Sequence, residues 1–257
     1  MIRGVLFDLD DTLFDHQRCA RAALAELQQA YASLRDRPFE EVEQTHARLL
    51  ESIHAQVLTG ALPLDVAREE RFRRLFEACG DAAAGLFARA AAQRYRDGYQ
   101  RHRRAIAGAG RLLEAVRGRA RVAVVSNNLL AEQRAKLAHC GLDGLIDALI
   151  VSEEAGVAKP DPGIFELALA RLGVPARQAV MIGDSWHADI DGARAAGIRA
   201  VWFNPRGCSP PRTDTAIRQL HALEPVDRAM AQIFDAWSSV DGQHPHPGAP
   251  HADGRCA

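Results

Sequence analysis

The stretch Gly4–Leu13, GVLFDLDDTL, constrains the fold of this chain more than any other segment. Its apolar beginning has the length and composition of a strand that is buried on both faces in a parallel sheet. Asp8 and Asp10 follow, and we expect them to point the same way because they are two residues apart. Two such carboxylates repel each other unless a cation lies between them, and Mg²⁺ prefers oxygen ligands of this kind. The stretch therefore predicts a site at a strand end, with a solvated acidic turn as the alternative.

Beyond Ala105, apolar strand patterns alternate with helical patterns, and the links between them are short. This alternation predicts an α/β fold with a doubly wound parallel sheet. After the first strand, the expected strands are Val122–Val125, Ala148–Val151, Ala179–Ile182 and Ala200–Phe203, and the expected helices lie near residues 111–116, 130–140, 164–172 and 190–196.

Residues 17–104 have a different texture, rich in Ala, Leu, Arg and Glu with few chain breaks. The segment predicts about four amphipathic helices packed as a bundle. Because it follows the first strand directly, we expect an inserted helical domain at 17–104 and a core formed by residues 1–16 and 105–238. Residues 239–257 repeat His, Pro and Gly and predict a disordered tail, with adventitious metal binding by its histidines as the alternative.

The charge balance and the apolar runs limit the partners that the sequence predicts. Lys and Arg total 32 against 33 for Asp and Glu, so no global field favours a nucleic acid polymer or an anionic membrane. No apolar run reaches the length of a membrane span. Five scattered cysteines without a CxxC pair, and a start that leaves no room for a signal peptide, predict reduced thiols and a cytoplasmic location. The chain is expected to be a monomer or a homodimer.

Three later strand ends also carry residues that are capable of chemistry. Ser126 and Asn127 follow one strand and could hold an anion or simply cap a helix. Lys159 lies in a Pro-rich loop before a helix, where it could meet an anion or remain a solvated side chain. Asp184 follows a glycine at the end of another strand, and Asp189 comes shortly after it. Taken alone, Asp189 is compatible either with a ligand site or with the start of a helix.

In combination, the chain resembles the haloacid dehalogenase-like (HAD) superfamily, whose members are mostly Mg²⁺-dependent phosphohydrolases. Its four motifs occur in order as Asp8–Thr12, Ser126, Lys159–Pro160, and Gly183–Ser185 with Asp189. The resemblance covers the chain from Ile2 to Asn204. It implies a Rossmann-like core with the Asp8 strand at the centre, flanked by the Ser126 and Asp184 strands. The insertion at 17–104 resembles the helical cap of the subfamily that includes small-molecule phosphatases.

The resemblance, together with the chemistry of phosphoryl transfer, assigns a role to each motif residue. Asp8 would be the nucleophile that forms an aspartyl-phosphate, and Asp10 the general acid and base. Mg²⁺ would be held by the carboxylates of Asp8 and Asp184 and by the backbone carbonyl of Asp10. The phosphoryl oxygens would be bound by Ser126, the Asn127 N–H and Lys159. Supporting roles fall to Thr12, in the Asp10 turn, and to Asp189, which would orient a metal-bound water.

We therefore expect a Mg²⁺-dependent phosphohydrolase that acts on a small phosphorylated metabolite, namely a nucleotide, a sugar phosphate or an organic acid phosphate. In the resembled family the dehalogenases lack an acid at the Asp10 position, which favours phosphate transfer here. A phosphomutase, a 2-haloacid dehalogenase and a non-catalytic phosphoacceptor or binding protein are the alternatives. Candidate contacts to the leaving group are Phe14, His16, Arg94, Tyr95, Tyr99 and Arg103.

Overall fold

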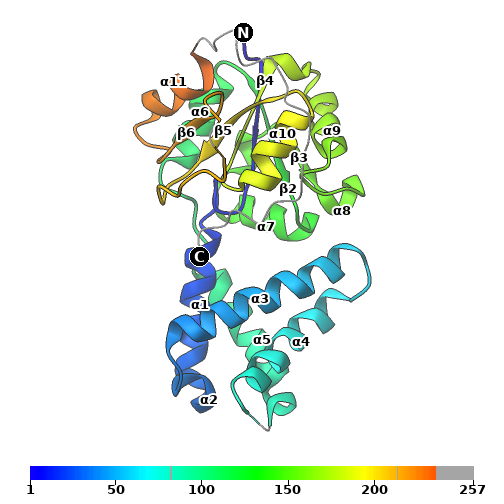
Figure 1. Ribbon diagram of the computed structural model, residues 1–257, viewed down its shortest axis with the longest axis vertical. Helices are drawn as coiled ribbons and strands as arrows, with labels where there is room; N and C mark the ends of the chain where they lie inside the picture. The colour runs from blue at the N-terminus through cyan, green and yellow to red at the C-terminus, as the bar shows by residue number, and fades with distance from the viewer. Residues whose placement is uncertain (82, 213, 236–257) are drawn as a thin grey trace. The chain divides into compact units, whose positions relative to one another are not determined.

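A computed structural model describes residues 1–81, 83–212 and 214–235 of the chain. Six parallel strands form a single sheet in the order β3-β2-β1-β4-β5-β6 (Figure 1). The strands are β1 (Gly4–Phe7), β2 (Arg121–Ser126), β3 (Ala148–Val151), β4 (Ala179–Gly183), β5 (Arg199–Phe203) and β6 (Arg218–Leu220). The predicted doubly wound parallel sheet is thus confirmed. β6 is not among the strands predicted from the sequence, because this edge strand has only three residues and two of them are polar.

The central strand of the sheet is β1, which pairs with β2 on one side and with β4 on the other. Phe7 is level with Val124 and with Ile182, so all three strands end at the same edge. The backbone N–H of Asp8 continues the pairing and donates to the Ile182 carbonyl over 2.9 Å. This register brings Ser126, the last residue of β2, and Asp184, which follows β4, to the edge where Asp8 lies.

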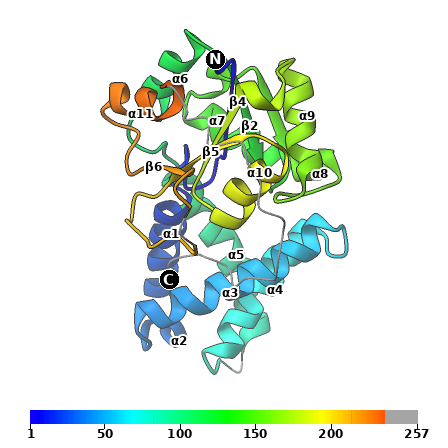
Figure 2. The same ribbon diagram turned by 45° about the horizontal axis from the view of Figure 1, so that its top comes forward.

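Helices cover both faces of the sheet. Figures 1 and 2 show α6 and α11 on one side of it and α8, α9 and α10 on the other. The helices that follow Ala105 are α6 (Ala109–Arg117), α7 (Leu130–His139), α8 (Ser152–Ala155), α9 (Pro162–Leu172), α10 (Gly192–Ala195) and α11 (Val226–Phe234). The single helix expected near 190–196 is instead a π-helical turn, Trp186–Asp191, followed by α10.

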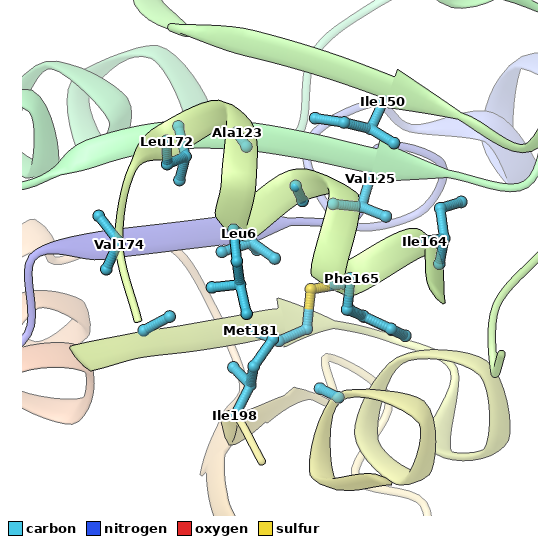
Figure 3. Packing of buried hydrophobic residues seen from close by; sticks show 14 residues of the cluster. Leu6, Ala123, Val125, Ile150, Ile164, Phe165, Leu172, Val174, Met181 and Ile198 are labelled. Carbon is cyan, nitrogen blue, oxygen red and sulfur yellow. The ribbon is translucent and has the colours of Figure 1, made fainter. Parts of the chain in front are cut away.

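Alternate side chains along the central strands face α9 and form the core beneath this helix. Figure 3 shows Leu6, Val125 and Met181 packed with Ile164 and Phe165. Leu6 and Met181 are fully buried, as are Ile164 and Phe165 of α9. Because alternate residues of a strand face opposite sides, Val5 and Phe7 are buried on the other face of β1. The strand that carries Asp8 is therefore held rigidly from both sides.

The chain divides into two compact units, which we call the core unit (Met1–Asp15 with the chain from Ala105 onward) and the cap unit (His16–Arg104). The cap unit contains α1 (His16–Ala30), α2 (Ala32–Arg35), α3 (Phe39–Leu58), α4 (Leu64–Ala78) and α5 (Ala84–Arg101). Leu24, Leu27, Phe72, Leu75 and Phe76 are buried in its interior. Four of its helices have 15 to 20 residues, and α2 is a short helix of four residues.

Some expectations concern features beyond these elements. In the described part of the chain, no helix has both the length and the apolar character needed to cross a bilayer. Cys19, Cys79 and Cys140 are free thiols. The tail predicted at 239–257 lies outside the described residues.

Candidate active site

Asp8 lies at the carboxyl end of β1, and its carboxylate is paired with a buried lysine. Lys159 Nζ lies 2.6 Å from Asp8 Oδ1 and 2.6 Å from Asp189 Oδ1, and it also donates to the Val125 carbonyl over 2.8 Å. The side chains of Lys159 and Asp189 are 3% and 1% exposed. One ammonium group therefore bridges two carboxylates in a site that is almost closed to water.

Three carboxylates of the core unit converge here. Single oxygen atoms of Asp8, Asp184 and Asp189 lie within 4.8 Å of one another. Burial raises the pKa of Asp8 to about 7; Lys159 opposes the shift, whereas the charge of Asp189 adds to it. Burial, with the charges of Asp8 and Asp189, raises the pKa of Asp184 well above its usual value. Excess negative charge in a desolvated oxygen cluster suits a hard divalent cation such as Mg²⁺.

Lys159 remains charged in this environment. Burial alone would lower the pKa of Lys159, but the nearby charges of Asp189 and Asp8 outweigh burial and raise it. Its backbone is fixed by the side chain of Asn127, which accepts from the Lys159 N–H over 2.7 Å and donates to the Lys159 carbonyl over 2.8 Å. The loop that carries Lys159 then enters α9, where Asp161 caps the helix by accepting from the Gly163 N–H. Asn127 thus links the end of β2 to the lysine loop.

Asp10 has a separate set of side-chain contacts with the turn after β2 and with α7. Lys136 Nζ lies 2.6 Å from Asp10 Oδ1, while Gln133 Nε2 and Asn128 Nδ2 donate to Asp10 Oδ2 over 2.9 and 3.2 Å. Gln133 Nε2 also donates to Ser126 Oγ over 2.6 Å. The Lys136 side chain is 4% exposed. Asp10 is therefore held by a cation and two amides, and the same network reaches Ser126.

Asp8 and Asp10 thus have different cationic partners, although we expected them to point the same way. The reason lies in the backbone, because β1 ends at Phe7 and the chain turns through Asp11, whose φ is 62°. The cluster of three carboxylates consists of Asp8, Asp184 and Asp189, and the Asp10 carboxylate is not part of it.

The remaining predicted residues lie around the carboxylate group. Thr12 Oγ1 donates to Asp184 Oδ1 over 3.5 Å, a long contact, and Trp202 Nε1 donates to the Asp184 carbonyl over 2.8 Å. The Ser185 N–H donates to Asp189 Oδ2 over 3.0 Å. A Cβ added at Gly183 would lie only 2.3 Å from the Asp189 carboxylate, so glycine is required for this approach.

The candidates for leaving-group contact fall in different environments. Phe14 belongs to the core unit, is 1% exposed and has Lys136 Nζ 5.2 Å from its ring centroid. In the cap unit Tyr95 is buried, Arg94 is exposed, and the Tyr99 hydroxyl lies 2.7 Å from His16 Nδ1. The Arg103 guanidinium lies 5.9 Å from the centre of the Tyr99 ring.

Lys136, Gln133 and Asn128 are not among the site residues predicted from the sequence. Gln133 and Lys136 are three residues apart, and that spacing places them on one face of α7. A Gln and a Lys at this spacing are common on solvated helices, so the pattern alone carries little information. The available signal was the position of this pair just after Ser126, in the helix that begins at the edge of the sheet.

Comparison with known proteins identifies the family of this chain. The sequence matches the haloacid dehalogenase-like hydrolase family over residues 2–197. It is 33% identical to the phosphoserine phosphatase of Thermus thermophilus over 226 residues, covering 80% of this chain and 90% of that protein. It is 39% identical to the pyrimidine 5'-nucleotidase YjjG of Escherichia coli over 123 residues, which cover 45% of this chain and only 55% of YjjG.

Solved structures agree with this assignment. The HAD-hydrolase YfnB of Bacillus subtilis, in a structure bound to magnesium, aligns with a TM-score of 0.71 and 25% identity. The alignment covers 89% of this chain and 98% of YfnB. The sequence motifs, the parallel sheet and these matches lead to one conclusion: the chain belongs to the haloacid dehalogenase-like hydrolase family.

Proposed function

We propose that this protein is a Mg²⁺-dependent phosphohydrolase that cleaves phosphate monoesters of small metabolites through an aspartyl-phosphate on Asp8. The observation that carries the proposal is the pairing of Asp8 with Lys159 beside Asp184 and Asp189 at the edge of the sheet. A nucleophilic carboxylate, a fixed ammonium and a cation site are what transfer of a phosphoryl group to a protein carboxylate requires. The phosphoserine phosphatase and the pyrimidine 5'-nucleotidase among the relatives support the same reaction class.

Asp8 and Asp184 are the side chains proposed to hold Mg²⁺, and the backbone carbonyl of Asp10 would complete the protein ligands. Their fit rests on the crowded carboxylates and on the raised pKa values of Asp8 and Asp184, because a cation relieves both desolvation and mutual repulsion. When bound, Mg²⁺ would neutralise phosphoryl oxygens and so reduce their repulsion of the nucleophile. Asp189 is proposed to hold Lys159 in place and to orient a water ligand.

The first chemical step is attack by an Asp8 carboxylate oxygen on phosphorus, with departure of the ester oxygen. Lys159 holds the phosphoryl oxygens by charge, and Ser126 with the Asn127 N–H donates to them. Burial of Lys159 strengthens this interaction because little water screens it. Asn127 contributes in a second way, since its side chain fixes the backbone of Lys159.

Asp10 is proposed to protonate the departing oxygen and then to remove a proton from the water that cleaves the aspartyl-phosphate. Lys136, Gln133 and Asn128 would act as positioning residues that aim this carboxyl group. A dehalogenase does not require proton delivery to its leaving halide, so an acid held by three donors favours phosphate monoesters as substrates. We further propose that the cap segment at 17–104 contacts the leaving group and shields the reaction from water.

The test is turnover of a generic aryl phosphate and of a panel of nucleotide, sugar and organic acid phosphates. We expect phosphate release that requires Mg²⁺ and stops with EDTA, and transient ³²P labelling of the wild type that is absent from Asp8→Asn. Stoichiometric halide release from 2-chloropropionate without phosphatase activity would assign the dehalogenase alternative. Exchange of phosphate between positions of a sugar phosphate would assign the mutase. Labelling without turnover would assign a phosphoacceptor.

A further inference from the structure

Trp202 of β5 connects its strand to the loop that carries the proposed metal ligands. The Trp202 Nε1 atom donates a hydrogen bond to the backbone carbonyl of Asp184 over 2.8 Å, although 18 positions separate the two residues. The parallel register explains this reach, because Trp202 lies level with Gly183, the residue before Asp184. Only 3% of Trp202 is exposed, so little water competes for the hydrogen bond. The backbone of Asp184 is therefore tied to the next strand of the sheet.

The segment that follows Asp184 has an unusual local geometry. It is a π-helical turn, Trp186–Asp191, which leads from the end of β4 into α10. Such turns are rare and are often found at functional sites. Asp189 lies within the turn, and Asp184 lies two residues before it. Because both carboxylates belong to this segment, their positions depend on the contacts that hold the turn against the sheet.

The ring of Trp202 is itself held by Trp186, the first residue of the π-helical turn. The two rings meet edge to face, with 5.0 Å between their centres and an interplanar angle of 88°. Aromatic pairs favour this arrangement because the positive edge of one ring meets the negative face of the other. Ile190 and Ala200 are buried in the same cluster. The Trp202 indole therefore has a fixed orientation, and its N–H group points to one acceptor.

The two indoles differ in their hydrogen bonding. Trp186 Nε1 is buried and has no hydrogen-bond partner in the described part of the chain, whereas Trp202 Nε1 donates to the Asp184 carbonyl. Both rings are almost completely buried, at 4% and 3% exposure, and they belong to the same cluster. Comparison of the two residues therefore separates the effect of this hydrogen bond from that of aromatic packing.

We propose that Trp202 is a positioning residue for divalent metal binding, because its indole N–H fixes the Asp184 peptide and thereby the direction of the Asp184 carboxylate. Groups that hydrogen-bond metal ligands from outside raise metal affinity by holding the ligands in the geometry that the cation requires. Mg²⁺ is sensitive to such positioning, since it demands short and nearly octahedral contacts. The inference rests on the proposed function, in which Asp184 is a ligand of Mg²⁺.

The experiment measures metal binding on EDTA-treated protein. Mn²⁺ is the probe, because oxygen ligands of this kind suit Mn²⁺ as well as Mg²⁺. Electron paramagnetic resonance measures the free Mn²⁺ and so gives its Kd, and displacement by Mg²⁺ gives the Kd of Mg²⁺. We expect Trp202→Phe to raise both Kd values by about tenfold or more. The Mg²⁺ concentration that gives half-maximal phosphatase activity should rise in parallel.

The matched control is Trp186→Phe, which removes an indole from the same cluster but no hydrogen bond between described residues. Its Kd for Mn²⁺ should equal that of the wild type. An equal increase in both variants would assign the effect to packing and overturn the proposal. An unchanged Kd in Trp202→Phe would overturn it as well.

A measurement on the wild type replaces the variant if Trp202→Phe fails to fold. In NMR spectra of ¹⁵N-labelled protein, the indole resonance of Trp202 should shift progressively as Mg²⁺ fills its site, since the metal and the indole act on the same residue. A Trp202 resonance that is unchanged at saturating Mg²⁺ contradicts the proposal. Failure of the wild type to bind either metal would instead reject the proposed function, and the inference with it.

Discussion

Lys136 and Asp10 form a partly buried ion pair, with 2.6 Å between Lys136 Nζ and Asp10 Oδ1, although 126 positions separate them in the chain. The pair joins α7 to the turn after β1, so the proposed acid and base is held by an element that begins just beyond the Ser126 strand. Gln133 strengthens the link because its amide donates to both Asp10 and Ser126. The position of the proposed proton-transfer group, Asp10, is therefore coupled to the end of β2.

The first prediction concerns this ion pair. Lys136→Met should reduce kcat for alkyl phosphate esters by roughly 10- to 100-fold, a part of the 10²–10⁴-fold that a positioned acid contributes. The loss should be smaller for 4-nitrophenyl phosphate, because nitrophenolate leaves without a proton. Lys136→Arg should recover part of the activity. Arg134→Met, at an exposed position on the same helix, is the control. Equal losses for both leaving groups would contradict a role in positioning Asp10.

A second prediction separates the two acids of the first motif. Asp8→Asn should abolish turnover of every ester, because the nucleophile is lost. Asp10→Asn should slow hydrolysis of alkyl esters by roughly 10²–10⁴-fold, with a smaller defect in the first step for an activated aryl ester. Pre-steady-state release of nitrophenolate separates the first step from hydrolysis of the aspartyl-phosphate. The assignment fails if Asp8→Asn retains turnover near that of the wild type.

The third prediction follows from the carboxyl groups with raised pKa values. Because the pKa of Asp8 rises from 3.8 to about 7 on folding, the metal-free folded protein binds more protons than the unfolded chain between these values. Its free energy of unfolding should therefore fall as the pH rises through that window. Mg²⁺ requires deprotonated carboxylates, so its stabilising effect should grow over the same range.

Thermal unfolding of EDTA-treated protein, with and without Mg²⁺ from pH 5 to pH 8, measures both effects. At a Mg²⁺ concentration about 100-fold above its Kd, the expected stabilisation is about 2.7 kcal/mol, or a Tm gain of several degrees. Asp8→Asn should reduce the gain and raise the Tm of the metal-free protein near pH 8, because one buried charge is removed. A Mg²⁺ effect of equal size at pH 5 and pH 8 would argue against these carboxylates as ligands.

A fourth prediction concerns the close approach of Gly183 to Asp189. Gly183→Ala should displace the Asp189 carboxylate, since the new Cβ would lie 2.3 Å from it, and Asp189 in turn holds Lys159. We expect kcat/KM to fall by a similar factor for all esters, since the phosphoryl group is common to them, together with a lower Tm. Gly144→Ala is the matched control, because a Cβ there meets no atom within 4 Å. Unchanged kinetics in Gly183→Ala would show that the position of Asp189 is unimportant.

Much of the core unit follows from local sequence. Val5, Leu6 and Phe7 predict a strand buried on both faces, and all three are fully buried in the centre of the sheet. The other predicted strands are present in the structure at the expected residues, because each is an uninterrupted apolar run of strand length. By contrast, Arg218–Leu220 forms β6 through pairing with β5 alone, and that pairing has no signature in three residues.

The sequence by itself determined which residues end the central strands, and hence that Asp8, Ser126 and Asp184 share one edge. Only the tertiary structure decided which charged groups pair there. Lys136 is buried against Asp10, and Asp189 joins Asp8 and Asp184. The physical reason is that apolar periodicity reports which face of an element is buried. The partner of a buried polar group instead depends on residues far away in the chain, brought near by packing.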